Sequence, residues 1–182
     1  MSSAENETEQ RSERRQIALV GAPNVGKSAT FNAITGRYVT VSNYPGTTVT
    51  FTEGRMKLGE GDERAQVIDV PGTYSLDATN RAEEVAVEMI EKASVIVNVL
   101  DATNLERNLN LTLSLLRSGK PVLCVLNMWD EALAHGVEID VAKLEERLTV
   151  PVVTTCALSG EGMLQLRERL PEARPGSLEF DE

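Results

Sequence analysis

Short, strongly apolar runs alternate with longer amphipathic segments along most of this 182-residue chain. The runs 17–20, 95–100 and 122–126 are almost wholly aliphatic, as expected of strands that are buried on both faces of a parallel sheet. The segments between such runs are long enough for helices. We expect helices at residues 27–36, 82–92, 105–117, 141–148 and 162–170. This rhythm predicts an α/β domain whose sheet is covered by helices on both faces.

One pair of strands departs from this alternation. Residues 48–58 alternate between apolar and polar side chains, and a return strand at 64–70 follows the turn-forming residues 59–62. A turn this short favours an antiparallel hairpin, whereas the polar segment 37–47 predicts turns. With a last strand at 152–154, we expect a six-stranded, mostly parallel sheet with one antiparallel edge strand.

The composition is that of a soluble globular protein, with 41% hydrophobic and 25% charged residues. We expect one domain over residues 16–170, preceded by a disordered lead at 1–15 and followed by a tail, or the start of a further domain, at 171–182. The longest apolar runs, 95–100 and 121–128, are far shorter than the roughly 18 residues that span a bilayer. A formal charge of −10 without a Lys/Arg cluster argues against nucleic acid as the main partner.

Two cysteines and one histidine give little sign of metal chemistry. Cys124 lies within an apolar run and Cys156 just after another, so we expect both to be small core residues in a reducing compartment. His135 precedes Gly136 at an expected helix end, where capping or exposure accounts for it. No His/Cys/carboxylate cluster has the spacing of metal ligands, so the sequence predicts no iron site in this segment.

The most specific motif begins where the first apolar run ends. Residues 21–28 fit the P-loop pattern G-x-x-x-x-G-K-[ST] in its required order of strand, loop and helix. Its glycines leave backbone N–H groups free to surround a phosphate, Lys27 adds a positive charge, and Ser28 offers a hydroxyl to Mg²⁺. The residues expected to bind the nucleotide here are Gly21, Ala22, Pro23, Asn24, Val25, Gly26, Lys27 and Ser28. The chain is therefore predicted to bind a nucleoside triphosphate with Mg²⁺.

A D-x-x-G motif ends the return strand of the expected hairpin and consists of Asp69, Val70, Pro71 and Gly72. Its place at a strand end, about forty residues after the P-loop, makes the motif informative. Ligands of such sheets bind beyond the carboxyl ends of the strands, so the two motifs are expected to converge. Asp69 can then hold Mg²⁺ through water, and the N–H of Gly72 can meet the γ-phosphate.

A third motif selects the base. It ends the strand at 122–126 and consists of Asn127, Met128, Trp129 and Asp130. Asp130 can accept two hydrogen bonds from the N1 and N2 donors of guanine, which adenine does not offer, so GTP is expected rather than ATP. After the last strand come Cys156, Ala157 and Leu158, where the N–H of Ala157 is expected to meet guanine O6.

Together these motifs resemble the P-loop GTPases, which are three-layer sandwiches of the Ras type, with Met128 in place of the usual Lys of N-K-x-D. A Met thioether can cover the base without adding charge. Within that class, residues 43–50, 69–76, 101–109 and 127–132 resemble the cytosolic N-terminal G domain of ferrous iron transport protein B. The resemblance covers about residues 16–170, and the run 101–109 is its most family-specific part.

The resemblance implies a switch I segment that includes Gly46, Thr47, Thr48, Val49 and Thr50. Thr48 is expected to meet Mg²⁺ and the γ-phosphate, with Thr47 as the alternative. Thr73 and Tyr74 stand where many GTPases have a water-orienting Gln, so we expect slow turnover. The family resembles K⁺-activated GTPases, which implies that Asn24 helps to hold K⁺ against the phosphates. The residues expected to act in catalysis are Lys27, Asn24, Thr48 and Gly72.

The implied function is slow, Mg²⁺-dependent and K⁺-stimulated GTP hydrolysis that regulates ferrous iron uptake. A helical domain and a membrane transporter segment of the same full-length chain would be its partners, at the cytoplasmic face of the inner membrane, and this segment alone would be soluble. One alternative is a soluble switch for ribosome assembly, against which the −10 charge argues. Another is a GTP-binding module with negligible turnover, against which the retained Lys27, Ser28, Thr48 and Asp69 argue. The oligomeric state stays open.

Overall fold

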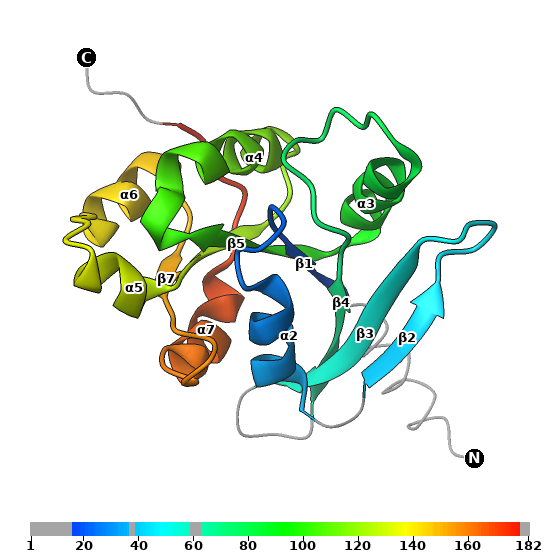
Figure 1. The fold of residues 1–182 in the computed structure, drawn as a ribbon, viewed down its shortest axis with the longest axis horizontal. Coiled ribbons are helices and arrows are strands. Elements are labelled where there is room, and N and C mark those ends of the chain that lie inside the picture. The colour runs from blue at the N-terminus through cyan, green and yellow to red at the C-terminus, as the bar shows by residue number, and fades with distance from the viewer. Residues whose placement is uncertain (1–15, 37–38, 59–62, 179–182) are drawn as a thin grey trace.

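The computed structural model describes residues 16–36, 39–58 and 63–178, which form a mixed sheet between two layers of helices (Figure 1). The sheet has seven strands in the order β2-β3-β4-β1-β5-β6-β7. Its five parallel strands are β1 (Gln16–Val20), β4 (Arg64–Asp69), β5 (Val95–Asp101), β6 (Val122–Asn127) and β7 (Val152–Thr154). The expected α/β sandwich of the P-loop GTPase type is confirmed, with β1 at the centre of the sheet.

The strand count is seven, so the expectation of six was wrong. The additional strand is β2 (Val39–Asn43), which lies at the edge and pairs with β3 (Thr50–Lys57). Because β2 is an edge strand with four of its five residues exposed, it lacks the apolar face that would have revealed it in the sequence. The single reversed strand is β3, which runs antiparallel to both neighbours and lies one place in from the edge. The expected hairpin turn at 59–62 lies outside the described residues.

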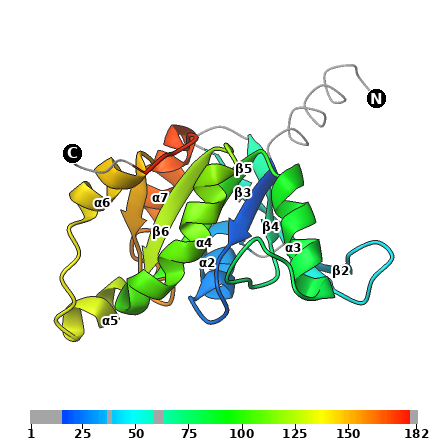
Figure 2. The ribbon, with the colours of Figure 1, turned by 90° about the horizontal axis from the view of Figure 1, so that it is seen from above.

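Alternate residues of the central strand face opposite cores. Ala18 and Val20 pack in one cluster with α3 (Arg81–Lys92), α4 (Leu105–Arg117) and α6 (Val141–Leu148). Ile17 and Leu19 pack in the other cluster with α2 (Lys27–Thr35) and α7 (Met163–Arg169). The view from above in Figure 2 shows α3 and α4 in front of the sheet. The described residues also form the helix α5 (Trp129–Ala134) and the 3₁₀ turns η1 (Ala102–Asn104) and η2 (Leu170–Glu172). This two-sided burial explains why the sequence of β1 is continuously apolar.

Side-chain caps fix where two helices begin. The side chain of Asn80 accepts a hydrogen bond from the N–H of Glu83 at the start of α3, and Asp140 accepts one from Lys143 at the start of α6. The expected helices 105–117 and 141–148 match α4 and α6 residue for residue. The helix end expected at His135 and Gly136 is the end of α5, but no range was predicted for this helix, since six residues carry too little periodicity.

Residues 173–178 continue the folded domain beyond residue 170. The N–H of Val122 donates to the carbonyl of Arg174 (2.9 Å), and the Nε of Arg174 donates to the carbonyl of Thr149 (2.7 Å). A Cβ added at Gly176 would lie 2.4 Å from a methyl group of Val150, so the chain passes very close to the core here. The described part of the expected tail is thus bound to the sheet, while residues 1–15 and 179–182 lie outside the description.

Candidate nucleotide-binding site

The P-loop connects the end of β1 to the start of α2, near the centre of Figure 1. Gly26 has a φ of 81°, and a Cβ added there would lie 2.1 Å from Nδ2 of Asn127. A Cβ added at Gly21 would lie 2.6 Å from the carbonyl oxygen of Val99. Glycine is therefore required at both positions because a side chain would collide with neighbouring atoms. At position 26 the positive φ favours glycine as well. Two side chains of the loop itself, Ala22 and Val25, are buried in the hydrophobic core.

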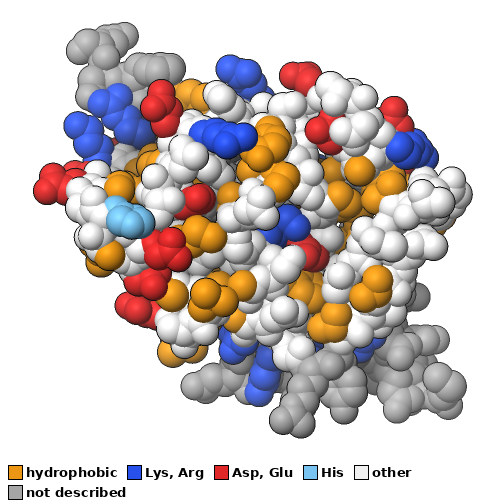
Figure 3. Space-filling view, in the orientation of Figure 1, with side chains coloured by type: hydrophobic (Ala, Val, Ile, Leu, Met, Phe, Trp, Pro, Cys, Tyr) orange, Lys and Arg blue, Asp and Glu red, His pale blue; other side chains and the backbone are white. Residues whose placement is uncertain are grey.

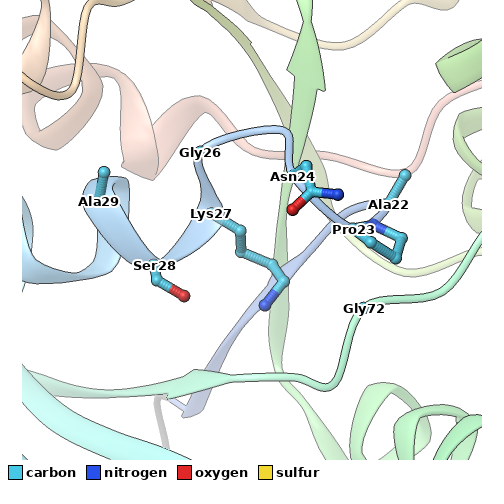
Figure 4. Close-up of a pocket in the computed structure, with 8 residues that line it drawn as sticks. All are labelled: Ala22, Pro23, Asn24, Gly26, Lys27, Ser28, Ala29 and Gly72. Atoms are coloured by element: carbon cyan, nitrogen blue, oxygen red, sulfur yellow. The ribbon is translucent and has the colours of Figure 1, made fainter.

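A cavity of about 380 Å³ opens over the loop. Its lining consists of Ala22, Pro23, Asn24, Gly26, Lys27, Ser28, Ala29 and Gly72, so it joins the P-loop to the D-x-x-G segment (Figure 4). Asn24 lies at the top of the loop with a φ of 67°, a left-handed conformation that Asn tolerates better than most residues. The N-terminus of α2 points its first N–H groups toward this region, which favours an anion such as phosphate.

Asp69 connects the two motifs by bonding to two residues that line this cavity, Lys27 and Ser28. Nζ of Lys27 donates to Oδ1 of Asp69, and Oγ of Ser28 donates to its Oδ2 (3.1 Å). The side chains of Lys27 and Asp69 are only 11% and 12% exposed, so this ion pair is well shielded from solvent. A hydroxyl beside a carboxylate supplies the hard oxygen ligands that Mg²⁺ prefers, so Ser28 and Asp69 fit a magnesium ion.

The segment after Asp69 is packed against the P-loop. A Cβ added at Gly72 would lie 3.2 Å from the backbone nitrogen of Pro23, and the N–H of Thr73 donates to the carbonyl of Gly21 (3.2 Å). Val70 is fully buried and Pro71 is half-buried. The hydroxyl of Thr73 is occupied as well, because it donates to the carbonyl of Ser75 (2.6 Å). The D-x-x-G segment and the P-loop thus form one structural unit.

Asn127 ties three segments together. Its Nδ2 donates to the carbonyl of Val25 in the P-loop (3.0 Å), and its Oδ1 accepts from the hydroxyl of Thr155 (3.1 Å) and the N–H of Ala157 (3.0 Å). All three hydrogen bonds are buried. The N–H of Ala157, which we expected to face guanine O6, is therefore bonded to Asn127 in this structure. The next residue, Leu158, is 90% exposed, and Cys156 is buried.

The rest of the N-x-x-D segment begins α5. Met128 has a φ of 59°, and its methyl carbon lies 3.7 Å from the Cβ position of residue 26, beside the P-loop. Trp129 packs against the hydrophobic core, and its N–H donates to the carbonyl of Thr155 (3.1 Å). Asp130 is exposed in the first turn of the helix. The sequence thus identified a segment in which Asn127 and Trp129 also hold the fold together.

Switch I is the part of the expected site that the structure does not bring to the cavity. Residues 44–49 connect β2 to β3, and Figures 1 and 2 both place this connection beside α3 and away from the P-loop. Thr48 and Thr50 are exposed, and neither Thr47 nor Thr48 lines the cavity. Gly46 has a φ of 72° and Val49 is half-buried. Neither threonine contacts the Lys27–Asp69 pair here.

One supporting residue was not expected from the sequence. Asn98, the polar residue within the apolar run 95–100, is 1% exposed and donates from Nδ2 to the carbonyl of Val20 (3.4 Å). Its Oδ1 accepts from the hydroxyl of Thr112 in α4 (2.7 Å). A polar residue inside an apolar run was the available signal, because such a group must find buried partners. These bonds support the end of β1 from which the P-loop leaves.

Across the face shown in Figure 3, side chains of both charges are scattered among hydrophobic ones. Within residues 16–36, 39–58 and 63–178, no three His, Cys, Asp or Glu side chains are grouped so as to hold a metal ion. The helices of this described part are all too short or too polar to cross a membrane.

A P-loop at the end of the central strand, with D-x-x-G and N-x-x-D segments bonded around it, defines a G domain of the P-loop GTPase class. The family model of ferrous iron transport protein B matches residues 15–170. The chain belongs to this family, which confirms the resemblance seen in the sequence.

Curated relatives from two bacteria illustrate the match. The Fe(2+) transporter FeoB of Helicobacter pylori is 43% identical over 158 residues, which cover 86% of this chain and 24% of the relative. The Fe(2+) transporter FeoB of Staphylococcus aureus is 39% identical over 150 residues, which cover 81% of this chain and 22% of the relative. The chain therefore spans about a quarter of the length of these relatives.

Solved structures match over most of the chain. The G domain of the T. maritima FeoB iron transporter is 38% identical with a TM-score of 0.80, over 87% of this chain and 97% of that one. A mutant of S. thermophilus NFeoB bound to GDP is 40% identical with a TM-score of 0.82, over 88% of this chain and 63% of that one. The cytosolic domain of L. pneumophila FeoB is 36% identical with a TM-score of 0.83, over 91% and 72% of the two chains.

Proposed function

We propose that this domain binds GTP, hydrolyses it slowly to GDP and phosphate, and thereby regulates a ferrous iron transporter at the cytoplasmic face of the inner membrane. The observation that carries the proposal is the contact of Asp69 with both Lys27 and Ser28, because it places a magnesium-binding carboxylate against the phosphate-binding loop. The GDP bound to the S. thermophilus relative supports the choice of nucleotide. The membrane segment and helical domain expected as partners would belong to the rest of a full-length chain.

Binding of the phosphates would rearrange the charges at Asp69. Lys27 would exchange its bond to Asp69 for one to the β- and γ-phosphates, while the N–H groups of the P-loop and of Gly72 bond to phosphate oxygens. Ser28 and Asp69 would then hold Mg²⁺, which neutralises negative charge on the phosphates. Because Lys27 and Asp69 are mostly buried together, breaking their pair without a phosphate present is costly.

Guanine would be read beside the P-loop. Asp130 would accept hydrogen bonds from N1 and N2 of the base, and Met128 would cover it with apolar surface. Asn127 already bonds to Val25 and Ala157, so its role would be to hold the two walls of the base site together. For guanine O6, the candidate donors are the N–H groups of Ala157, shared with Asn127, and of exposed Leu158.

The two residues after Gly72, Thr73 and Tyr74, favour slow turnover. Thr73 is buried and bonded to the carbonyl of Ser75, and Tyr74 is 43% exposed, so neither replaces a water-orienting Gln. Asn24 lines the cavity, and its neutral amide oxygen would suit K⁺ beside the phosphates, where the ion neutralises developing charge. Under this proposal phosphate release is faster in KCl than in NaCl, and equal rates would remove Asn24 from the mechanism.

The proposal is tested by titrating the domain with GTP, GDP and ATP in Mg²⁺ and by measuring phosphate release from GTP. We expect GTP and GDP to bind at least about 100-fold more tightly than ATP, since adenine lacks the two N–H donors for the Asp130 carboxylate and each such bond contributes about 1.5–3 kcal/mol. Equal affinity for ATP would overturn the guanine assignment. Tight GTP binding without phosphate release in KCl would instead indicate a binding module. The transport role is tested in the full-length gene, where Lys27→Ala should abolish ferrous iron uptake.

A further inference from the structure

The connection between β2 and β3 is folded on itself. The N–H of Tyr44 donates to the carbonyl of Val49 (2.8 Å), and the carbonyl of Tyr44 accepts from both the N–H (3.0 Å) and the hydroxyl (2.9 Å) of Thr47. The N–H of Val49 in turn donates to the hydroxyl of Thr47 (3.1 Å). Residues 44–49 are therefore expected to move as one unit unless this turn is broken.

Tyr44 attaches that unit to α3. Its hydroxyl donates to Oε2 of Glu88 (2.8 Å) and accepts from Nζ of Lys92 (2.6 Å), two residues that lie one helical turn apart on the same face. The ammonium of Lys92 also lies 5.1 Å from the centre of the Tyr44 ring, and the rings of Tyr44 and Phe51 form a T-shaped pair with their centres 6.4 Å apart. We call Tyr44, Glu88 and Lys92 the α3 anchor.

The anchor is incompatible with the contact that switch I is proposed to make. For Thr48 or Thr47 to meet Mg²⁺ and the γ-phosphate, residues 44–49 must reach the cavity over the P-loop. The structure places them beside α3 instead, away from that cavity (Figures 1 and 2). Since Thr47 is bonded to the backbone of Tyr44, bringing it to the cavity requires that the anchor or the turn be released.

We infer that the α3 anchor holds switch I open and that Tyr44 sets the equilibrium between the open and closed positions of this segment. The inference rests on the proposed function, because the closed position is the one in which switch I meets GTP and Mg²⁺. For a ligand that binds only the closed state, the apparent affinity is the intrinsic affinity multiplied by the fraction of molecules in that state. The anchor therefore weakens binding of a triphosphate and leaves binding of GDP, which offers no γ-phosphate to switch I, unaffected.

Tyr44→Phe is the sharpest test, because it removes the hydroxyl and keeps the ring that packs on Phe51. A non-hydrolysable imido analogue of GTP is titrated with Mg²⁺ into wild type and variant, and GDP is titrated in parallel. We expect the variant to bind the analogue about three- to tenfold more tightly, the effect of losing one partly buried and one exposed hydrogen bond, with unchanged GDP affinity. Hydrogen exchange of the amides of residues 44–49 should also accelerate in the nucleotide-free variant.

Variants of α3 provide the matched controls. Glu88→Ala combined with Lys92→Met removes both partners of the Tyr44 hydroxyl and should reproduce the gain, and adding Tyr44→Phe to this pair should bring no further change. Glu91→Gln, which removes a charge from an exposed position on the same helix, should leave both affinities unchanged. If Tyr44→Phe instead brought its full gain again when added to the Glu88/Lys92 pair, a role for the anchor would be contradicted.

The possible outcomes separate the anchor from the proposed function. If wild type distinguishes GTP from ATP but Tyr44→Phe leaves the ratio of analogue to GDP affinity unchanged, the anchor is refuted and the function stands. Equal weakening of both ligands would show that Tyr44 serves the fold alone, which also refutes the inference. If wild type binds neither guanine nucleotide, the proposed function itself fails.

Discussion

Replacing Asn127 by alanine should destabilise the whole domain, whatever nucleotide it binds. The substitution leaves three buried groups without their partner: the carbonyl of Val25, the hydroxyl of Thr155 and the N–H of Ala157. At about 1 to 1.5 kcal/mol for each hydrogen bond, the expected loss is about 3 to 5 kcal/mol. That is a large part of the roughly 5–15 kcal/mol by which a domain of ordinary stability is folded.

Urea unfolding followed by the fluorescence of Trp129, the single tryptophan of the chain, measures this loss directly. Asn110→Ala is the matched control, because Asn110 is exposed on α4 and should cost less than about 0.5 kcal/mol. Asn127→Asp retains the acceptor for Thr155 and Ala157 but loses the donor to Val25 and buries a charge, so it should be no more stable than the alanine variant. A loss below about 1 kcal/mol for Asn127→Ala would refute the reasoning that Asn127 holds the three segments together.

Three further substitutions or treatments test other parts of the structure. Gly26→Ala should abolish GDP binding in titration, because its Cβ would lie 2.1 Å from Nδ2 of Asn127; retained affinity would show that the loop can shift. The Arg169 guanidinium lowers the pKa of Glu145 below its usual 4.5, so this carboxylate stabilises the fold above about pH 4.5 and the gain disappears as the pH falls through the lowered value. Glu145→Gln should therefore lower the free energy of unfolding measured with urea at pH 7. In the variant this free energy should also fall less steeply than in wild type as the pH is lowered below about 4.5, and an equally steep fall would contradict the prediction. Burial raises the pKa of the Cys124 thiol to about 12, so iodoacetamide at pH 8 should label it only after unfolding, and rapid labelling of the native domain would contradict its burial.

The sequence predicted those parts of the domain in which local pattern and burial agree. The apolar runs form β1, β5 and β6 because strands that are buried on both faces are apolar at nearly every position. The P-loop glycines lie where close approach of the backbone requires them. The edge strand β2 was not predicted because it is mostly exposed. It therefore has no buried face that would show as alternating apolar residues in the sequence.

The sequence pattern did not predict contacts between segments that are distant along the chain. The bond of Asn127 to Ala157 and the bond of Tyr44 to Glu88 join residues 30 and 44 positions apart, and neither leaves a local signature. The motifs predict that Asn127 and Ala157 lie at the guanine base. In the structure the N–H of Ala157 donates to Oδ1 of Asn127. Switch I was identified by resemblance, but its position beside α3 depends on tertiary packing alone.

The central claim is that the domain selects guanine through Asp130 and binds its phosphates at the Lys27–Asp69 junction. Calorimetric titration of wild type and Asp130→Asn with GDP and xanthosine diphosphate tests it most directly. Wild type should prefer GDP, and the variant should prefer the xanthine nucleotide, because an amide donor at position 130 matches the O2 acceptor of xanthine. Unchanged GDP affinity in Asp130→Asn would contradict the account.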